Sequence, residues 1–316
     1  MQELIMDAMF IAIYAIGVGT ISSMVGIGGG IFNTPLLMIV FLLSEQFAPA
    51  TALVAALFLA IASSIAYWRQ NPRPIIPKVG LFLAITTVPG SLLGVILRTM
   101  IESPYALRLI FGISLMPVAI RMMFAIRREK GDIASELAGY SMADITDKRL
   151  AVSLFGGFIG GISAGLLGIG GGAVVVPVLA VGMGLPMHAA VATSMFTMMF
   201  TASAGTAMNF LNGFVNPYYA VSLGVGMLIG AQIGSRLACR VNSVQLKRVF
   251  GIILVFPLVK MMRLGQMWLD PLDTSLLMAT IGDFIIWLII VLPIGLVRLY
   301  LIRRESAKSS GSQERS

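Results

Sequence analysis

The feature that most constrains this chain is a nearly continuous series of apolar segments, most of them long enough to cross a lipid bilayer. A transmembrane helix needs about 20 predominantly apolar residues. Of the 316 residues, 58% are hydrophobic and 11% are charged, whereas soluble domains are about 45–50% apolar and about 25% charged. The sequence therefore predicts an all-α, polytopic integral membrane protein without room for a soluble catalytic domain.

Hydropathy and charge divide the chain into about 8–11 membrane segments, and the count depends on whether every segment crosses fully. Two segments, 31–43 and 170–184, are short for a full crossing, and each follows a cluster of glycines. The N-terminal segment carries Glu3 and Asp7 but no basic residue, so we interpret it as a retained membrane segment and not as a secretory signal. The expected segments are 4–25, 31–43, 48–68, 78–98, 105–126, 149–167, 170–184, 187–211, 218–238, 246–264 and 276–300.

An internal repeat relates two parts of the chain. The stretch Gly26-Ile-Gly-Gly-Gly30 followed by Pro35 recurs 142 residues later as Gly168-Ile-Gly-Gly-Gly172 followed by Pro177. Chance similarity between apolar stretches would not keep glycine, proline and basic positions in register. Further matches are Ala48–Thr51 with Val191–Ser194, Gly90–Gly94 with Gly230–Gly234, and Leu107–Gly112 with Leu246–Gly251. We predict a first repeat at 1–127, a polar loop at 128–148, a second repeat at 149–264, an additional helix at 276–300 and a disordered tail at 305–316.

The basic residues predict that the two repeats are inverted, because equivalent loops of inverted repeats carry opposite Lys and Arg bias. The loop after the third segment holds Arg69, Arg73 and Lys78, and its counterpart at 211–217 holds none. The next pair of loops reverses this bias, with Arg98 alone in the first repeat and a cluster in the second: Arg236, Arg240, Lys247 and Arg248. We expect broken helices, an outside N-terminus and a cytoplasmic C-terminus. A short segment that does not cross would change the count on which this orientation rests.

The distribution of reactive residues disfavours several classes of function. No Asp, Glu, Lys or Arg occurs from Leu150 to Ser235, which disfavours acid-base enzymes and cation paths lined by carboxylates. His188 lies at a segment end, as interfacial histidines do, and Cys239 has no second cysteine with which to form a disulfide or metal site. The basic residues lie at segment ends and form no nucleic-acid-binding patch. We therefore predict no enzymatic activity, no cofactor, no metal and no nucleic-acid partner; the chain's environment is the lipid bilayer.

The two glycine clusters are the first candidate binding site: Gly28, Gly29 and Gly30, and Gly170, Gly171 and Gly172. Glycine leaves backbone N–H groups accessible, and each cluster precedes a short segment whose first turn we expect to contain Pro35 or Pro177. A helix N-terminus inside the membrane presents free N–H donors and a partial positive charge, so it can hold an anion without arginine. Asn33 and Thr34 can add side-chain donors. The alternative is that the glycines form G-x-x-x-G pairs that let helices pack closely.

Hydroxyl residues beside the clusters are the second candidate set. Thr193, Thr197 and Thr201 share one helical face, with Ser194 beside it and Thr51 as the matching hydroxyl of the first repeat. Such a face can line a hydrated path or form hydrogen bonds between helices. The 21 methionines are flexible packing residues in one interpretation and a soft-metal path in the other. The substrate site assigned from sequence includes Thr51, Thr193, Ser194 and Thr197.

Several of these motifs together carry a resemblance to a known family. They are Gly-Ile-Gly-Gly-Gly…Pro at 26–35 and 168–177, Ala-Thr-Ser at 192–194, Gly-Ala-Gln-Ile-Gly at 230–234 and a basic-Phe-Gly pattern at 248–251. In combination they resemble the sulfite exporter TauE/SafE family, over about residues 8–300. The resemblance implies a bacterial or archaeal inner-membrane permease of duplicated architecture, with members linked to sulfite, sulfoacetate and other small organic or sulfur-containing anions.

Residues and resemblance together predict a secondary transporter (permease or exporter) of small anions such as sulfite or organosulfur anions. The anion would lie between the glycine clusters near the membrane midplane, and rocking of one repeat against the other would expose it alternately to each side. A proton is the candidate coupling ion, and Asp283 can either relay it or pair with a neighbour. The alternatives are a channel, a non-transporting scaffold subunit and a soft-metal permease. The identity of the anion, the direction of transport and the oligomeric state stay open.

Overall fold

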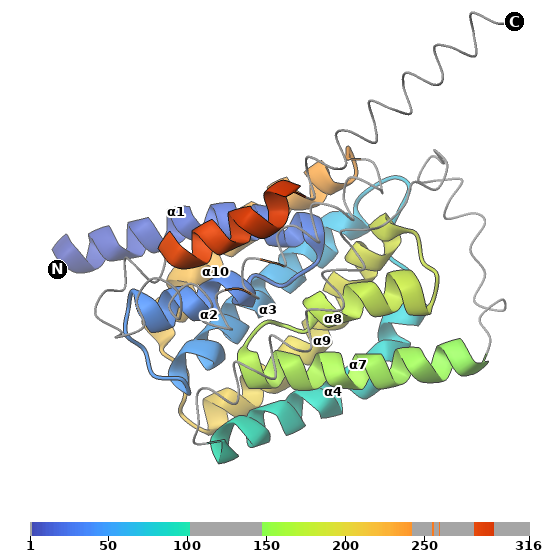
Figure 1. Ribbon diagram of the computed structural model, residues 1–316, viewed down its shortest axis with the longest axis horizontal. Coiled ribbons are helices and arrows are strands. Elements are labelled where there is room, and N and C mark those ends of the chain that lie inside the picture. The colour runs from blue at the N-terminus through green and yellow to red at the C-terminus, as the bar shows by residue number, and fades with distance from the viewer. Residues whose placement is uncertain (1, 102–146, 242–254, 256–258, 260–280, 294–316) are drawn as a thin grey trace, which may run out of the picture. The chain divides into compact units, whose positions relative to one another are not determined.

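The computed structural model describes residues 2–101, 147–241, 255, 259 and 281–293. Over these residues the secondary structure is helical, and the predicted all-α class is confirmed. The chain divides into two units, Met1–Leu254 and Val255–Ser316; the second contributes the described helix Ile281–Pro293. The segments expected at 105–126 and 246–264, most of the loop at 128–148 and the tail at 305–316 lie outside the described residues. The elements of the first unit (Figure 1) are α1 (Gln2–Val25), α2 (Gly30–Ile39), α3 (Phe47–Trp68), α4 (Pro77–Met100), α7 (Asp147–Leu167), α8 (Gly172–Pro177), the π-helical turn η2 (Val178–Gly182), α9 (Met187–Leu211) and α10 (Pro217–Ala238).

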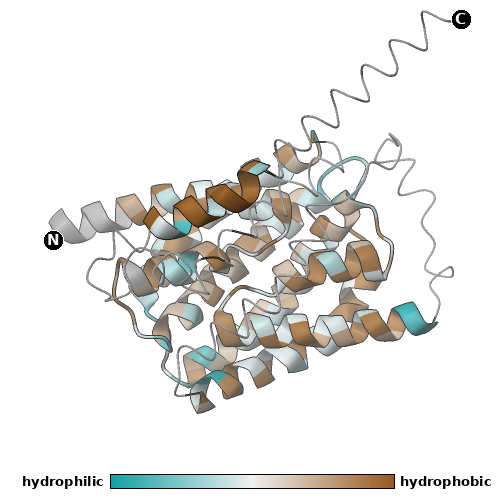
Figure 2. Ribbon diagram, in the orientation of Figure 1, coloured by the Kyte–Doolittle hydropathy of each residue, from teal (hydrophilic) through white to brown (hydrophobic). Residues whose placement is uncertain are grey.

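Among the described residues, α3, α4, α7 and α10 are each long and apolar enough to cross a membrane. Hydrophobic residues recur along these helices (Figure 2). Outward apolar side chains such as Ile85 and Phe155, each 68% exposed, suit contact with lipid and not with water. α9 is equally long and uncharged, but its hydroxyl residues lower its hydropathy and most of its side chains are buried inside the protein. The chain is thus a multi-pass membrane protein in which α9 is an interior helix.

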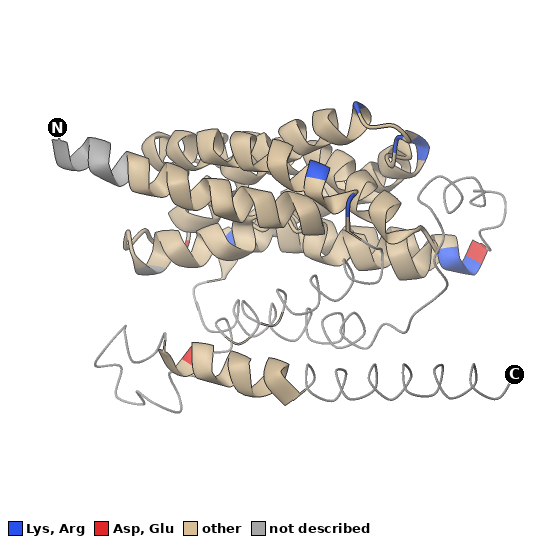
Figure 3. Ribbon diagram, turned by 90° about the horizontal axis from the view of Figure 1, so that it is seen from above, with Lys and Arg blue, Asp and Glu red and all other residues tan. Residues whose placement is uncertain are grey.

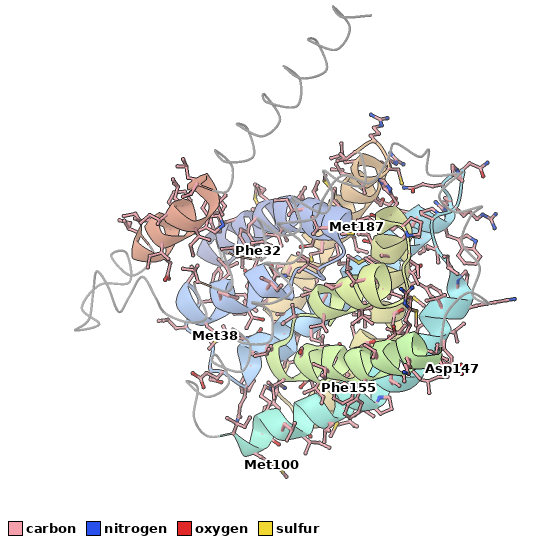
Figure 4. All side chains as sticks on the ribbon, turned by 45° about the vertical axis from the view of Figure 1, so that its right-hand side comes forward. Phe32, Met38, Met100, Asp147, Phe155 and Met187 are labelled. Carbon is pink, nitrogen blue, oxygen red and sulfur yellow. The ribbon has the colours of Figure 1, made fainter. Side chains whose placement is uncertain are left out.

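Glycines join two pairs of helices in parallel. A Cβ added at Gly90 or Gly94 of α4 would fall on the carbonyl oxygen of Phe158 or Ile162 in α7. The α1–α10 pair repeats the pattern, with Gly226, Gly230 and Gly234 facing the carbonyls of Ala12, Ile16 and Thr20. In both pairs the residue numbers of the contacting positions rise together along the two helices. The two helices of each pair are therefore parallel. Figure 4 accordingly shows Met100 and Asp147 at opposite ends of the α4–α7 pair.

Two matching hydrogen bonds show that α3 and α9 run in opposite directions. Thr51, near the start of α3, accepts a hydrogen bond at 3.1 Å from the N–H of Asn216, which follows the end of α9. Thr193, near the start of α9, accepts one at 3.0 Å from the N–H of Ile76, which follows the end of α3. Each threonine therefore satisfies a backbone donor at the start of α10 or α4, the fourth helix of the opposite half.

These contacts are reciprocal, as they are in a two-fold arrangement. The packing of α1 on α10 has its equivalent in α7 on α4, and the threonine bonds form a second such pair. The hydrogen bonds match Thr51 with Thr193, the same shift of 142 residues that relates the glycine clusters. The sequence alignment had instead matched Thr51 with Ser194. That match was wrong by one residue, because an Ala-Thr pair occurs in both repeats and short apolar stretches align equally well in neighbouring registers.

The described basic residues gather at one end of the first unit, where α3 and α10 finish and α4, α7 and α9 start (Figure 3). We call this the basic end; its residues are Arg69, Arg73, Lys78, Lys148, Arg149, Arg236 and Arg240. Arg98 is the exception among the described basic residues, because it lies in the last turn of α4, at the opposite end. The segregation has the pattern that the positive-inside rule produces in membrane proteins.

Candidate functional site

The two glycine clusters cross each other inside the first unit. A Cβ added at Gly30 would fall on the carbonyl oxygen of Gly168, and one added at Gly172 would fall on that of Gly26. Backbone therefore lies directly on backbone at both points, which no residue with a side chain permits. The structure brings the two predicted clusters, 142 residues apart in sequence, into direct contact.

The middle glycine of each cluster is left-handed and caps the N-terminus of a short helix. Gly29 and Gly171, the N-cap residues of α2 and α8, have φ angles of 72° and 82°, and no side chain caps either helix. In α2 the N–H groups of Phe32 and Asn33 bond to the carbonyl of Gly29, both at 3.0 Å. The N–H groups that precede them in a helix have no intrahelical acceptor. The backbone N–H groups without an intrahelical acceptor, in the first turns of both short helices, therefore lie at the crossing.

Two methionines mark the depth of the crossing. Met198, midway along α9, places its sulfur where a Cβ at Gly28 or Gly170 would collide with it. The terminal methyl and sulfur of Met227, in α10, lie against Gly29. The crossing is therefore level with the middle of the interior helix. Both sulfurs touch the glycine backbone, and unbranched methionine side chains have several rotamers with which to move aside.

α2 runs back along α1 from this crossing. Gly29 lies near Ser22, and further along α2 the carbonyl of Phe32 accepts a 3.1 Å hydrogen bond from Tyr14, two turns earlier in α1. At ten residues, α2 is about 15 Å long, half the thickness of a bilayer core. The expectation that this segment is too short to cross agrees with its length.

Proline placement in the short helices differs from the prediction. Pro35 and Pro177 are each the sixth residue of their helix, not members of its first turn. The left-handed cap starts each helix at the last glycine of the cluster, so the proline comes one turn later than expected. In the second repeat α8 ends at Pro177 and continues as η2, consistent with proline removing a helical hydrogen bond.

Three polar residues next to the first cluster have apolar counterparts in the second repeat. Ser22 Oγ and Asn33 Oδ1 are buried without a partner in the structure, and Asn33 Nδ2 contacts the sulfur of Met227 at 3.9 Å. Thr34 donates a 3.1 Å hydrogen bond to the carbonyl of Leu167, which joins the halves. The residues 142 positions later are Ala164, Val175 and Val176. The site assigned from sequence did not include Ser22.

Most of the predicted hydroxyls on α9 join that helix to α4. Thr197 donates at 3.1 Å to the carbonyl of Gly80, and the hydroxyls of Thr201 and Thr87 lie 2.7 Å apart. With Thr193 bonded to Ile76, these three threonines form the helix contact that the sequence left as the alternative to a lining face. Ser194 differs: its hydroxyl is buried and has no partner in the structure.

Arg98 is a buried cation that sequence reasoning treated as a loop charge. It is 3% exposed; its Nη1 donates at 3.1 Å to the carbonyl of Gly165, and its Nη2 donates to Asn209 Oδ1. Its isolation, in a loop without other basic residues, was the signal that could have identified it. Hydropathy does not show which face of an apolar helix turns inward.

The described residues contain no group of three or more His, Cys, Asp or Glu side chains arranged to hold a metal ion. His188 lies at the start of α9, 4% exposed, with Nε2 2.7 Å from the carbonyl of Val241. Cys239 donates to Gln70 Oε1 at 2.7 Å, and burial raises the pKa of its thiol to about 11. Over the described residues, the chemistry of the crossing is that of backbone N–H groups, hydroxyls, one amide and two thioethers.

Comparison with known proteins finds a relative and a family. Over 224 residues the chain is 28% identical to the probable membrane transporter protein YunE of Bacillus subtilis (strain 168), an alignment that covers 64% of this chain and 79% of that protein. No solved structure matches the chain. Residues 11–261, well over half of the sequence, match the family described as sulfite exporter TauE/SafE. The chain belongs to the sulfite exporter TauE/SafE family.

Proposed function

We propose that the protein is a secondary transporter that holds a small anion at the crossing of its two glycine clusters. Membership of an exporter family and similarity to a probable membrane transporter support transport across the membrane, and neither points to an enzyme class. Sulfite and related organosulfur anions are the proposed substrates, because the family description names sulfite. The protein works in the inner membrane of the cell.

The observation that carries the proposal is the convergence of two helix N-termini at mid-depth. α2 starts at Gly30 and the α8–η2 segment starts at Gly172, and these two residues touch the opposite cluster. A helix N-terminus has free N–H donors and about half a positive charge, so two of them facing one volume attract an anion without a basic side chain. Half-helix ends near the midplane are the substrate sites of many transporters built from repeats.

Three unpartnered polar atoms belong to residues near this volume: the hydroxyls of Ser22 and Ser194 can donate to an anion, whereas Asn33 Oδ1 is an acceptor and would have to turn its amide to donate. Ser22 lies beside Gly29, Asn33 is in the first turn of α2, and Ser194 is on α9. Buried polar atoms normally have a hydrogen-bond partner, so their lack of one in the structure supports a ligand there. Thr51, Thr193 and Thr197 hold neighbouring helices, and in the proposal they fix the site's shape instead of contacting the anion.

Inverted repeats are part of the proposal, with 1–127 as the first and 149–264 as the second. The support is the helix directions: α3 opposes its mate α9, while α1 and α7 belong to parallel pairs with α10 and α4. Rocking of one half against the other would expose the crossing alternately. The basic end faces the cytoplasm by the positive-inside rule, and the C-terminus is proposed to lie on that side.

A flux screen in proteoliposomes tests the proposal. Purified protein is reconstituted and uptake of sulfite, sulfate, thiosulfate, small sulfonates and small carboxylates is measured with and without a proton gradient. We expect saturable uptake of at least one oxyanion, and a dependence on the gradient if a proton is the coupling ion. Uptake no faster than in empty vesicles would refute transport and favour a scaffold; non-saturating current would favour a channel; metal-dependent stabilisation would favour a soft-metal permease.

A further inference from the structure

We propose that Arg98 and Asn209 form a second anion site, on the route between the glycine crossing and the end of the protein opposite the basic end. The inference rests on the proposed transport function. Its ligand is the oxyanion in transit, which binds to the guanidinium and to the side-chain amide before or after it occupies the crossing.

Both side chains are buried and have donors without acceptors. Arg98 is 3% exposed and Asn209 is fully buried, yet Arg98 Nε and Asn209 Nδ2 have no partner in the structure. Arg98 Nη2 donates to Asn209 Oδ1, so the two unpartnered donors belong to side chains in direct contact. Neither partner of Arg98 is a carboxylate. A buried cation without a counter-charge is costly, and an anion that accepts from both donors removes that cost.

Membrane orientation does not account for Arg98. The other described basic residues lie at the basic end, where loop charges set topology (Figure 3). Arg98 lies at the opposite end, against the orientation bias, and its burial removes it from the lipid headgroups to which a snorkelling arginine would reach.

The two-fold relation supplies an internal comparison. At the equivalent place in the other half, Tyr67 donates a 2.8 Å hydrogen bond to the carbonyl of Ser23, just as Arg98 donates to Gly165. Residues 23 and 67 are each 142 positions before 165 and 209. A neutral hydroxyl therefore makes the structural bond at one end, so helix packing alone does not require a cation at the other.

The position suits a subsite on a path. Gly165 is three residues before Gly168, the first glycine of the motif Gly168–Gly172. Arg98 contacts the carbonyl of Gly165, about one helical turn before the glycines of the second repeat, so an anion held there would lie next to the crossing on the same route.

The test uses Asn209→Asp, a change of nearly the same shape that places a carboxylate on the guanidinium. Arg98→Gln removes the charge, and Tyr67→Phe is the matched control that removes the equivalent structural bond at the basic end. Full-length protein is assayed for uptake of sulfite into proteoliposomes and for the shift of its thermal unfolding midpoint with sodium sulfite at constant ionic strength.

Without sulfite, we expect Asn209→Asp to unfold at or above the wild-type temperature. We expect the same substitution to weaken the dependence of uptake and of the unfolding midpoint on sulfite concentration at least tenfold. Arg98→Gln weakens it similarly where it folds, and Tyr67→Phe leaves it unchanged. Wild-type sulfite dependence in Asn209→Asp overturns the second site while wild-type uptake still supports transport. If wild-type vesicles take up neither sulfite nor any other anion of the flux screen, the proposed function fails. A sulfite-dependent thermal shift that is equal in wild type and Asn209→Asp overturns the Arg98 site, whatever the uptake.

Discussion

The contact between the glycine clusters predicts a specific cost for adding one methyl group. In Gly30→Ala the new Cβ falls on the carbonyl oxygen of Gly168, well inside the 3.4–4 Å of ordinary van der Waals contact. Gly30 is not among the residues with positive φ, so alanine meets no backbone strain there. The substitution therefore tests the crossing and nothing else.

The size of the effect follows from the atoms involved. A carbonyl of a neighbouring backbone cannot rotate away as a side chain can, so the two clusters must separate by roughly 1 Å. Overpacking of this kind costs about 1–3 kcal/mol of unfolding free energy. Gly172→Ala meets the carbonyl of Gly26 in the same way and should cost a similar amount. Because either substitution already separates the clusters, the double variant should lose less than the sum of the two.

The assay is unfolding of the purified protein by SDS titrated into mild detergent. Gly17→Ala is the matched control, since Gly17 is in α1 with nothing within 4 Å of an added Cβ; it should be neutral or stabilising by about 0.5–1 kcal/mol. The crossing is refuted if Gly30→Ala is as stable as Gly17→Ala, or if the costs of Gly30→Ala and Gly172→Ala add fully.

Two further predictions concern the two-fold relation and its orientation. Thr51→Val and Thr193→Val each leave a backbone N–H of a helix start unpaired, so each should cost about 1–3 kcal/mol in the same SDS assay, and a loss confined to one of them would contradict the reciprocity. Cysteines placed at the equivalent C-cap positions in Arg69→Cys and Asn212→Cys should react with an impermeant maleimide from opposite sides of the membrane; reaction from one side would contradict inversion. The native thiol of Cys239, with a pKa near 11 through burial, should react slowly at pH 7.5 and faster as the pH approaches 11, because the thiolate is the nucleophile; fast labelling at pH 7.5 would contradict its burial.

The sequence predicted the helices well because their signals are local. Apolar length and a proline at the first position place α10 at Pro217–Ala238, against the expected 218–238, and α9 matches 187–211 at both ends. The glycine clusters were also recognisable, because a triple glycine before a short segment is a local pattern. Their meeting was inferred from the repeat alone.

Other features depend on packing that the sequence does not encode locally. Thr197 and Ser194 have similar chemistry, yet one contacts α4 and the other is unpartnered, although their directions around α9 differ by only about 60°. Arg98 looked like one more loop charge, since the burial of a residue at a helix end depends on which helices surround it. The asymmetry between Ser22 and Ala164 became meaningful only when both were placed beside equivalent glycines.

The most direct test of the central claim compares sulfite uptake by Gly29→Ala and Gly213→Ala in proteoliposomes. The two glycines have nearly equal φ angles, 72° and 71°, so alanine imposes the same backbone strain in both. At Gly29 the added Cβ collides with the flexible end of Met227 and lies 3.4 Å from Ser22 Oγ, an ordinary contact, whereas at Gly213 nothing lies within 4 Å. We predict at least a tenfold loss of uptake in Gly29→Ala at normal abundance, with near wild-type uptake in Gly213→Ala. Equal uptake by the two variants would contradict an anion site at the glycine crossing.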